Sequence, residues 1–321
     1  MTLWQYILRR ILSTLPTLFG ALVIMFILTR ILPGDPVLMV LGPAHSSPEN
    51  VEQMRKVMGI DQPLPVQFVR YLGQLMRGDL GYSWHTGNPV SKELIMRFPA
   101  TFELTSLALI LMVVFGLPLG IVAGYYRNKT PDNIINGITV MGISMPSFWL
   151  GLLLIILFVV ALNWLPPGGR VAFLEDPGTA WRYLLMPVLT LSVRASGIFI
   201  RFTRTSMLEV LPEDYVRTAR AKGLPESLVV ARHALRCALI PVVTVVGLEF
   251  GRLLVGAVIA EQIFAWPGVG RLIIQAVGQR DYVIVQGVLL LLVIVFVLVN
   301  LITDLLYGVL DPRIRLVGES R

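Results

Sequence analysis

The stretch that decides the fold runs from Leu104 to Tyr125 and reads LTSLALILMVVFGLPLGIVAGY, with no charged side chain in it. A helix of about 20 residues is long enough to cross the roughly 30 Å hydrocarbon core of a bilayer. Five other predominantly apolar blocks follow the same pattern, and they are residues 11–29, 134–162, 183–200, 239–260 and 283–301. The sequence therefore predicts an all-α integral membrane protein with six transmembrane helices.

The composition points to the same class of protein. Of the 321 residues, 55% are hydrophobic and 15% are charged, whereas a soluble domain carries about 25% charged residues. The mean hydropathy is +0.74. These values exclude a soluble enzyme, a disordered chain and a disulfide scaffold, and the single cysteine, Cys237, permits no intrachain disulfide.

The net charge of +7 reflects membrane topology rather than nucleic-acid binding, because the basic residues lie between the apolar blocks. With the N-terminus inside, the cytoplasmic set is Arg9, Arg10, Arg127, Lys129, Arg201, Arg204, Arg217, Arg220, Lys222, Arg232, Arg236, Arg313, Arg315 and Arg321. The short outer loops then hold Arg170, Arg182, Arg271 and Arg280. We predict that both termini face the cytoplasm and that the long polar segment lies outside.

The polar segments divide the chain into four expected parts. These are an N-terminal transmembrane helix in 1–31, an extracytoplasmic helical segment in 32–100, a five-helix core in 101–310 with a cytoplasmic loop at 205–238, and a cytoplasmic tail in 311–321. The first helix is expected to be retained, because no small-x-small cleavage site follows it.

Two short amphipathic helices are expected within 32–100. The first begins near Pro48 and ends at Gly59, since proline suits a first helical turn and glycine a stop. The second covers 66–76, with an inward face expected to hold Phe68, Val69, Leu72 and Met76. In the third apolar block, Gly142, Pro146 and Gly151 are expected to tilt or kink the helix.

Motifs for catalysis are missing from the sequence. It contains no phosphate-binding Gly-x-x-x-x-Gly-Lys-Ser/Thr loop, no His-Glu-x-x-His and no Gly-x-Ser-x-Gly. Its three histidines, His45, His85 and His233, have no ligand spacing. We therefore expect no catalytic residue, no metal site and no cofactor in this chain.

The most informative segment is the loop between the fourth and fifth apolar blocks, where Glu213–Gly223 reads EDYVRTARAKG. Glu213 and Asp214 follow Pro212, so acidic groups occupy a first helical turn, where the helix dipole favours them. Gly223 supplies a stop. The pattern predicts a short surface helix.

The remaining residues of this helix suggest a docking role. Arg217, Arg220 and Lys222 lie toward its end, and Tyr215, Ala219 and Lys222 share one stripe. A small-residue face of this kind suits insertion into another protein's groove. The alternative is a solvated loop whose charges only set topology.

Glu213–Gly223, followed by HALRCALIP at His233–Pro241, resembles the cytoplasmic loop of bacterial ABC importer permeases of the dipeptide, oligopeptide, glutathione and nickel class. Importers carry a Glu-Ala-Ala and glycine pattern there. Ala219 and Gly223 match it, while Arg217 and Thr218 replace its first two residues. The same resemblance extends to Tyr6–Arg10, Pro16–Thr17, Leu32–Pro36, Gly78–Gly81, Ser83, Ser144–Pro146, Arg201–Arg204, Ile263–Arg271, Arg280–Tyr282 and Asp311–Arg315.

The resemblance implies the permease fold of the first ABC importer type and an assembly of several chains. That assembly has a second permease, usually a different chain, two cytoplasmic P-loop ATPases that bind ATP and Mg²⁺, and an extracytoplasmic substrate-binding protein. The helix at 213–223 would transmit ATPase closure to the membrane. The expected cargo is a short peptide, with glutathione, a nickel chelate or haem as alternatives. A stand-alone secondary transporter is the rival class, but its paired broken helices in two related halves are not seen.

Three charged residues interrupt the apolar blocks, namely Arg194, Glu249 and Arg252. Helix rise places Glu249 and Arg194 about 15 Å from their respective ends of the spans, near the midplane. Glu249 and Arg252 share a helix face. The three form either an ion pair or triad that holds two helices together, or the lining of an aqueous pathway.

The segment after the fifth span contains Phe264, Trp266, Pro267 and Gly268, with Trp266 expected near the outer surface. It is interpreted either as an aromatic interfacial anchor or as a gate or docking edge for the binding protein. Within the span itself, Gly247, Gly251 and Gly256 are expected to permit close helix packing.

Overall fold

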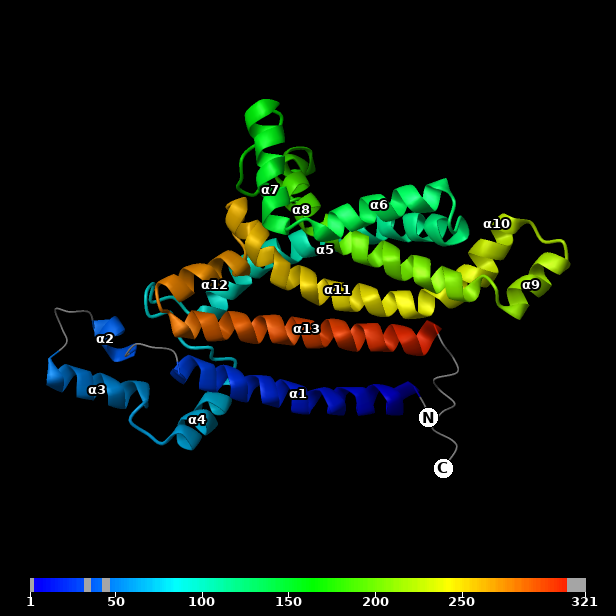
Figure 1. Ribbon diagram of the computed structural model, residues 1–321. Coiled ribbons are helices and arrows are strands. Elements are labelled where there is room, and N and C mark those ends of the chain that lie inside the picture. The colour runs from blue at the N-terminus through cyan, green and yellow to red at the C-terminus, as the bar shows by residue number, and fades with distance from the viewer. Residues whose placement is uncertain (1–2, 32–35, 42–46, 311–321) are drawn as a thin grey trace. The chain divides into compact units, whose positions relative to one another are not determined.

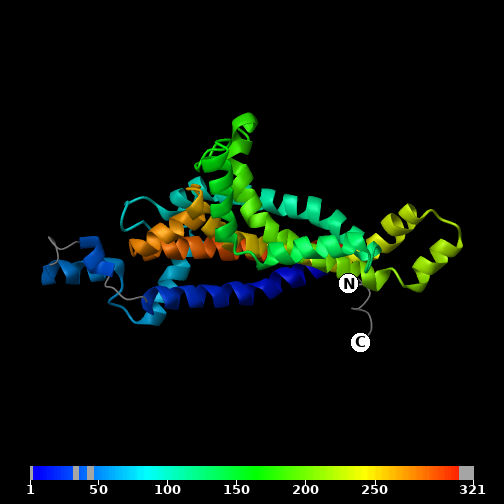
Figure 2. The ribbon, with the colours of Figure 1, turned by 45° about the horizontal axis from the view of Figure 1, so that its top comes forward.

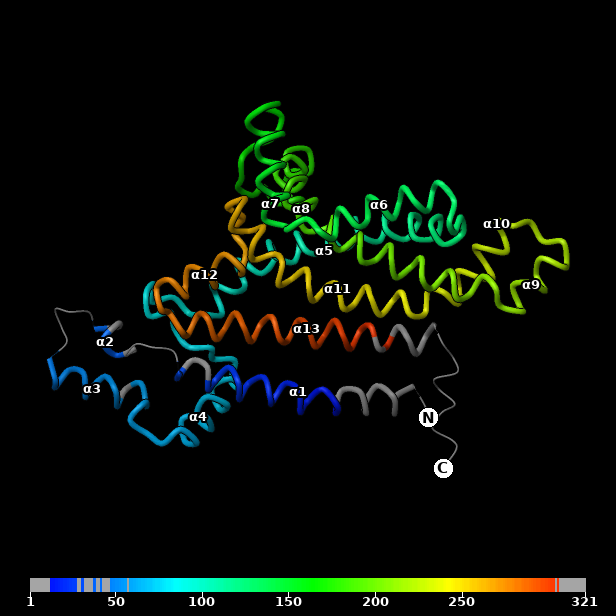
Figure 3. Tube along the Cα trace, viewed as in Figure 1, coloured from blue at the N-terminus to red at the C-terminus, as the bar shows by residue number. Residues whose placement is uncertain are grey.

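The computed structural model describes residues 3–31, 36–41 and 47–310, and within them the chain is built from helices (Figures 1 and 3). The long helices are α1 (Leu3–Ile31), α5 (Val90–Tyr125), α8 (Pro177–Val210), α11 (Leu235–Ile263) and α13 (Tyr282–Leu310). The shorter α-helices are α2 (Pro36–Leu41), α3 (Pro48–Met58), α4 (Leu64–Met76), α6 (Thr130–Ser144), α7 (Ser147–Leu154), α9 (Asp214–Ala221), α10 (Glu226–Leu228) and α12 (Val269–Gly278). Two π-helical segments, η2 (Ile155–Ala161) and η3 (Val229–Ala234), complete the set.

Extended structure in the described ranges amounts to one isolated bridge between Tyr82 and Pro89. The predicted all-α fold class is confirmed. The tail at 311–321, His45 and residues 32–35 lie outside the described residues, so the predictions that fall on them stay predictions.

Four helical stretches among the described residues are long and apolar enough to cross a membrane, and they are Val90–Tyr125, Pro177–Val210, Glu226–Ile263 and Tyr282–Thr303. The bent pair Thr130–Ser144 and Ser147–Ala161 adds a fifth if it counts as one span. Leu12–Ile27 within α1 is a shorter apolar stretch. Six spans therefore stays a prediction.

The expected kink in the third apolar block is a full break at Met145 and Pro146. The axes of the two halves differ by 98°, and α7 stands away from α6 in a second view (Figure 2). Met145 adopts an extended conformation, with φ −80° and ψ 122°. A residue before proline is pushed out of the helical region, and proline has no amide to continue the hydrogen-bond ladder. Pro146 therefore accounts for the break.

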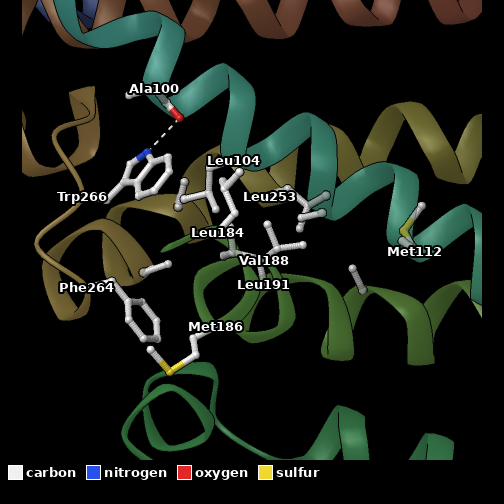
Figure 4. Packing of buried hydrophobic residues seen from close by; sticks show 14 of the residues in the cluster. Ala100, Leu104, Met112, Leu184, Met186, Val188, Leu191, Leu253, Phe264 and Trp266 are labelled. Carbon is white, nitrogen blue, oxygen red and sulfur yellow. Dashed lines mark hydrogen bonds between the residues drawn. The ribbon is translucent and has the colours of Figure 1, made fainter. Parts of the chain in front are cut away.

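The first of two compact units contains residues up to Ile11, Ala100–Gly270 and residues from Leu298 onward. Its apolar core joins α5, α8 and α11, and Leu104, Leu191 and Leu253 contribute one buried side chain from each helix (Figure 4). In a bilayer, such side chains hold helices together by van der Waals packing rather than by their removal from water.

A row of glycines lets α5 and α8 approach closely. A Cβ atom at Gly116 would lie 2.7 Å from Phe199, and one at Gly120 would lie 2.5 Å from Thr203. The same row continues at Gly124. Small residues four apart are a common means of close packing between membrane helices. This row, which the sequence reading missed, positions the end of α8 that leads into α9.

The glycines of α11 also pack closely. A Cβ atom at Gly247 would overlap the Thr303 hydroxyl, and one at Gly256 would lie 3.4 Å from Leu191. Gly251 is buried. The predicted packing role of these glycines is confirmed at Gly247, where no larger side chain fits.

The second compact unit contains Leu12–Pro99 and Arg271–Val297. The predicted helix at 48–58 is confirmed as α3. The Ser47 hydroxyl accepts a hydrogen bond from the Asn50 amide, and Gly59 ends the helix with φ +66°. Both are ordinary cap arrangements.

The inward face predicted for the second short helix is wrong at two of its four positions. In α4, Val69 is 68% exposed and Met76 is 84% exposed, whereas Phe68 and Leu72 are half-buried. The buried position is Gln67, whose amide nitrogen donates to the carbonyl oxygens of Ile60 and Gln62 at 3.2 and 2.8 Å. The helix is rotated so that this amide satisfies the turn that precedes it.

Candidate functional site

The short helix α9 lies at one end of the first unit beside α10 (Figure 1). Glu213 is its N-terminal cap residue with extended backbone, and Asp214 occupies the first turn. Gly223 follows it with φ +77°, a conformation that glycine adopts without steric cost. The helix predicted in this loop is confirmed. The loop itself is shorter than 205–238, because α8 continues to Val210.

An apolar cluster holds α9 in place. Val216 and Ala219 are both buried, and they pack with Met207 from α8 and with Val229 and Ala238 from the start of the next long helical stretch. Positions three apart fall on the same helix face. The inward face of α9 is therefore Val216 and Ala219.

This arrangement corrects the predicted docking stripe. Ala219 is 5% exposed and belongs to the core, so it offers no surface to another protein. The exposed face carries Asp214, Tyr215, Arg217 and Lys222. Arg217 and Asp214 form an ion pair one turn apart, and such surface pairs contribute little to stability.

Arg220 braces the loop that follows α9. Its guanidinium lies 2.9 Å from the Glu226 carboxylate and 3.4 Å from the Leu211 carbonyl oxygen. The hydrogen bond that Arg220 donates to Glu226 raises the pKa of Arg220 above its ordinary value. Arg220 therefore joins the two ends of the loop rather than extending freely from it.

Tyr215 is the aromatic residue on the outward face, and its side chain is 42% exposed. Partial burial, reinforced by a hydrogen bond with the Cys237 thiol, raises the pKa of Tyr215 above its ordinary value. Its hydroxyl stays protonated at physiological pH and is available as a hydrogen-bond donor.

An ion pair that the sequence reading missed joins α6 to α8 at this same end of the unit. Arg204 Nε and Nη2 lie 2.7 and 2.8 Å from the two carboxylate oxygens of Asp132. The Asn128 amide and the Asn136 side chain also donate to Asp132, which is 1% exposed. Bidentate pairs of this kind are geometrically specific. In the sequence, Arg204 is recognisable only as one of the positive charges that set the topology, and its partner is not apparent.

The charges within the apolar blocks form one ion pair, and it lies inside one helix. Glu249 Oε1 and Arg252 Nη1 on α11 are 2.5 Å apart. Glu249 is 3% exposed, whereas the Arg252 side chain is 64% exposed. Arg194 on α8 is exposed and makes no ion pair in the described part of the chain. The hypothesis of an ion pair or triad that links two helices is therefore wrong.

The segment after α11 is a buried junction rather than a surface edge. Trp266 is fully buried, Phe264 is 1% exposed, and the indole nitrogen of Trp266 donates to the Ala100 carbonyl at 2.9 Å (Figure 4). Arg170 lies over the Trp266 ring at 5.7 Å. Burial of Trp266 contradicts its interpretation as an aromatic interfacial anchor, whereas its position near the outer side of the membrane stays a prediction. Pro267 is exposed.

A buried carboxylate completes this junction. The Glu261 side chain is fully buried and accepts a hydrogen bond from the Thr101 hydroxyl at 2.5 Å. The Val269 amide in turn donates to the Thr101 oxygen at 2.9 Å. A Cβ atom at Gly268 would overlap the Glu261 carboxylate, so the glycine is required for close approach. The sequence offered no signal for Glu261 beyond an acid at the end of an apolar span.

Within the described residues, no group of three or more histidine, cysteine, aspartate or glutamate side chains is placed to hold a metal ion. Cys237 is exposed.

Two family comparisons match the chain. Residues 116–316 match the family described as binding-protein-dependent transport system inner membrane component. Residues 3–105 match the N-terminal part described for the membrane components of the same systems.

Relatives and a solved structure agree with these matches. The glutathione transport system permease protein GsiC of Escherichia coli strain K12 is 43% identical over 311 residues, which cover 97% of this chain and 99% of the relative. The same values hold for the protein of that name from Salmonella paratyphi A. The inward-facing MetNI methionine ABC transporter has a similar fold, with a TM-score of 0.56 and 21% identity. The match covers 68% of this chain and 96% of that one.

Proposed function

This chain belongs to the inner-membrane components of binding-protein-dependent transport systems, and on that premise we propose that α9 is the element through which cytoplasmic ATPases drive it. As a member of that family the chain is a multi-pass inner-membrane permease of an ABC importer, which works with ATPase and substrate-binding subunits. The proposals below concern how its residues serve that role.

The observation that carries the coupling proposal is the two-sided character of α9. Its inner face, Val216 and Ala219, is fixed in an apolar cluster, while its outer face presents Tyr215, Arg217 and Lys222 to solvent. A helix anchored in this way can transmit a push from a partner to α8 and α11, because the cluster contains residues of both. Glu213, Asp214, Arg220 and Gly223 fix the ends of the helix and its loop.

We place ATP hydrolysis on the separate ATPase subunits, which also bind ATP and Mg²⁺. The chain carries no phosphate-binding loop, and α9 supplies a protein contact rather than a nucleotide site. This chain then needs no cofactor of its own. Because α9 must reach those ATPases, we propose that it lies in the cytoplasm, and the charge distribution favours both termini on the same side.

The translocation pathway is assigned to the faces of α8 and α11 that carry Arg194 and Arg252. An arginine exposed to lipid at mid-membrane depth costs several kcal/mol, so these two side chains must face water or another protein. A second, homologous permease supplies the other wall, and a heterodimer is the arrangement we propose. Buried Glu249 holds Arg252 in position from within the same helix.

Glutathione or another short peptide is the proposed cargo. The named relatives transport glutathione, and a peptide carboxylate is complementary to the excess positive charge of Arg194 and Arg252. Phe264, Trp266, Pro267 and Gly268 form the junction at the other end of α11 from α9. We propose that this junction holds the end of α11 in position and that the exposed Pro267 contacts the binding protein.

The coupling proposal is tested by reversing charge on the outer face of α9. Arg217→Glu and Lys222→Glu are compared with Arg232→Glu, a matched control on an exposed arginine of the neighbouring η3 segment. We expect ATPase association to weaken about tenfold in the first two variants, since interface residues dominate binding. Membrane insertion should be unchanged. Equal ATP hydrolysis and uptake in all three variants would contradict the proposal.

A further inference from the structure

The second unit contains a partly open cavity that the transport role does not use. Its volume is about 1260 Å³, larger than the roughly 300–1,000 Å³ of small-molecule sites. Its walls come from the C-terminal half of α1, from α3 and α4, from residues 79–84 and from the first turns of α13. All of these segments belong to the same compact unit.

One wall of the cavity is apolar. Val23, Phe26 and Ile27 line it, and they belong to the apolar stretch Leu12–Ile27 of α1. Phe68 of α4 packs edge-on against Phe26, with 5.2 Å between ring centroids. This wall can contact hydrocarbon but offers nothing to a free ion.

A second part of the wall is basic and adjoins the apolar part. Among the described residues, Arg30, Arg55 and Arg70 line it, together with the carboxylate of Asp79. The Arg30 guanidinium lies 4.1 Å from the Phe26 ring centre and donates to Gln67 at 3.3 Å. Arg30 follows the apolar stretch by three residues, so the basic wall begins directly after that stretch.

Two polar atoms in the cavity wall are buried without partners. By distance and angle, the Tyr71 hydroxyl and the Gln286 amide nitrogen make no hydrogen bond within the described residues, although the Gln286 side chain lies near enough to Tyr71 to lower its pKa against the larger effect of burial. Leaving such a group unsatisfied costs about 1–3 kcal/mol. Burial raises the pKa of Tyr71 above its ordinary value, so the hydroxyl is a neutral donor. Both residues line the cavity, and both can donate to a ligand oxygen.

We propose that this cavity binds an anionic phospholipid, with its phosphodiester between the arginines and Tyr71 and its acyl chain along the apolar wall of α1. Only an amphiphile satisfies both walls at once. The lining arginines favour a net negative headgroup, such as phosphatidylglycerol, over a zwitterionic one, whose ammonium group they would repel. The ligand would stabilise the packing of α3 and α4 on the end of α1.

The test uses the purified importer complex in nanodiscs of phosphatidylcholine with added phosphatidylglycerol, and measures retained lipid by native mass spectrometry. Arg55→Gln combined with Arg70→Gln is compared with Lys56→Gln combined with Arg77→Gln. The control removes the same charge from two exposed residues that do not line the cavity, Lys56 in α3 and Arg77 at the C-terminal cap of α4. We expect affinity for phosphatidylglycerol to fall about fivefold per cavity arginine and to stay unchanged in the control.

Tyr71→Phe keeps the ring and removes only the unpartnered hydroxyl. We expect weaker retention of phosphatidylglycerol, while thermal stability in phosphatidylcholine alone is unchanged or higher, because the unsatisfied group is gone. If the hydroxyl served only to stabilise the fold, Tyr71→Phe would instead lower the thermal stability and leave lipid retention unchanged.

Three results would overturn the proposal. The first is equal retention of phosphatidylglycerol in the cavity and control variants. The second is inorganic phosphate or glycerol phosphate displacing the lipid at millimolar concentration, which would identify a free anion as the ligand. The third is cross-linking of the cavity arginines to the substrate-binding protein with lipid retention unaffected.

Discussion

The two ends of α11, in the first unit, differ in which side chains they bury and which they expose. At one end, α9 keeps two small apolar residues inside and turns its charged residues outward. At the other, the junction around Trp266 buries its aromatic rings and a carboxylate. A short polar segment can therefore be a surface, whereas a loop rich in aromatic and glycine residues can be part of the core. The first end is suited to contact with a partner and the second to holding helices together.

The largest effect is expected at the junction. Trp266→Ala should lower the free energy of unfolding by about 3–5 kcal/mol, as for other large-to-small changes in a core, because the ring is fully buried. Thermal unfolding of the purified protein measures it. Pro267→Ala, next in the chain but exposed, is the control and should be close to neutral. Similar unfolding temperatures for Trp266→Ala and Pro267→Ala would show that the buried Trp266 ring does not hold the junction together.

The second largest effect on stability is expected at the α9 end, where the ion pair of Asp132 and Arg204 joins α6 to α8. Asp132→Asn should destabilise the protein by about 2 kcal/mol, because it leaves the Arg204 charge facing an amide. Adding Arg204→Gln should recover part of the loss, and a double-mutant cycle on unfolding free energies measures the coupling. Strictly additive losses would show that the pair is not what joins α6 to α8.

The sequence predicted elements much better than it predicted partners. Apolar length located the long helices, and Pro212 and Gly223 located α9 to within a residue or two. The break at Pro146 was expected only as a kink, since its angle depends on what α7 packs against. Periodicity assigned Ala219 to a docking face because alanine fits either a core or an interface, and only tertiary contacts decide between them.

Paired residues were the hardest to predict. Asp132 and Arg204 are seventy-two positions apart, and Thr101 and Glu261 are one hundred and sixty apart. Nothing local in the sequence marks such pairs. The pair of Glu249 and Arg252 could be predicted, because residues three apart lie on the same face of a helix.

A matched pair of substitutions on α9 separates its two faces. Ala219→Leu forces a larger side chain into the apolar cluster and should cost about 1–3 kcal/mol through overpacking. Ala221→Leu makes the same change at an exposed position and should alter stability by less than about 0.5 kcal/mol. Unfolding temperature measures the difference. If both variants were equally stable, α9 would not rest on the cluster.

The smallest effect on stability is expected for the pathway arginines, which belong to neither end. Arg252→Gln should leave the free energy of unfolding within about 0.5 kcal/mol, because the Arg252 side chain is 64% exposed. Loss of the positive charge in Arg252→Gln, or in Arg194→Gln, should slow peptide uptake about fivefold. This corresponds to roughly 1 kcal/mol. Arg182→Gln, on an exposed residue near the start of α8, is the control and should transport normally. Uptake by reconstituted complex at equal yield separates transport from assembly. If Arg252→Gln instead reduced the yield of folded complex, and Glu249→Gln restored it, the pair would be structural and the pathway would have to be sought elsewhere.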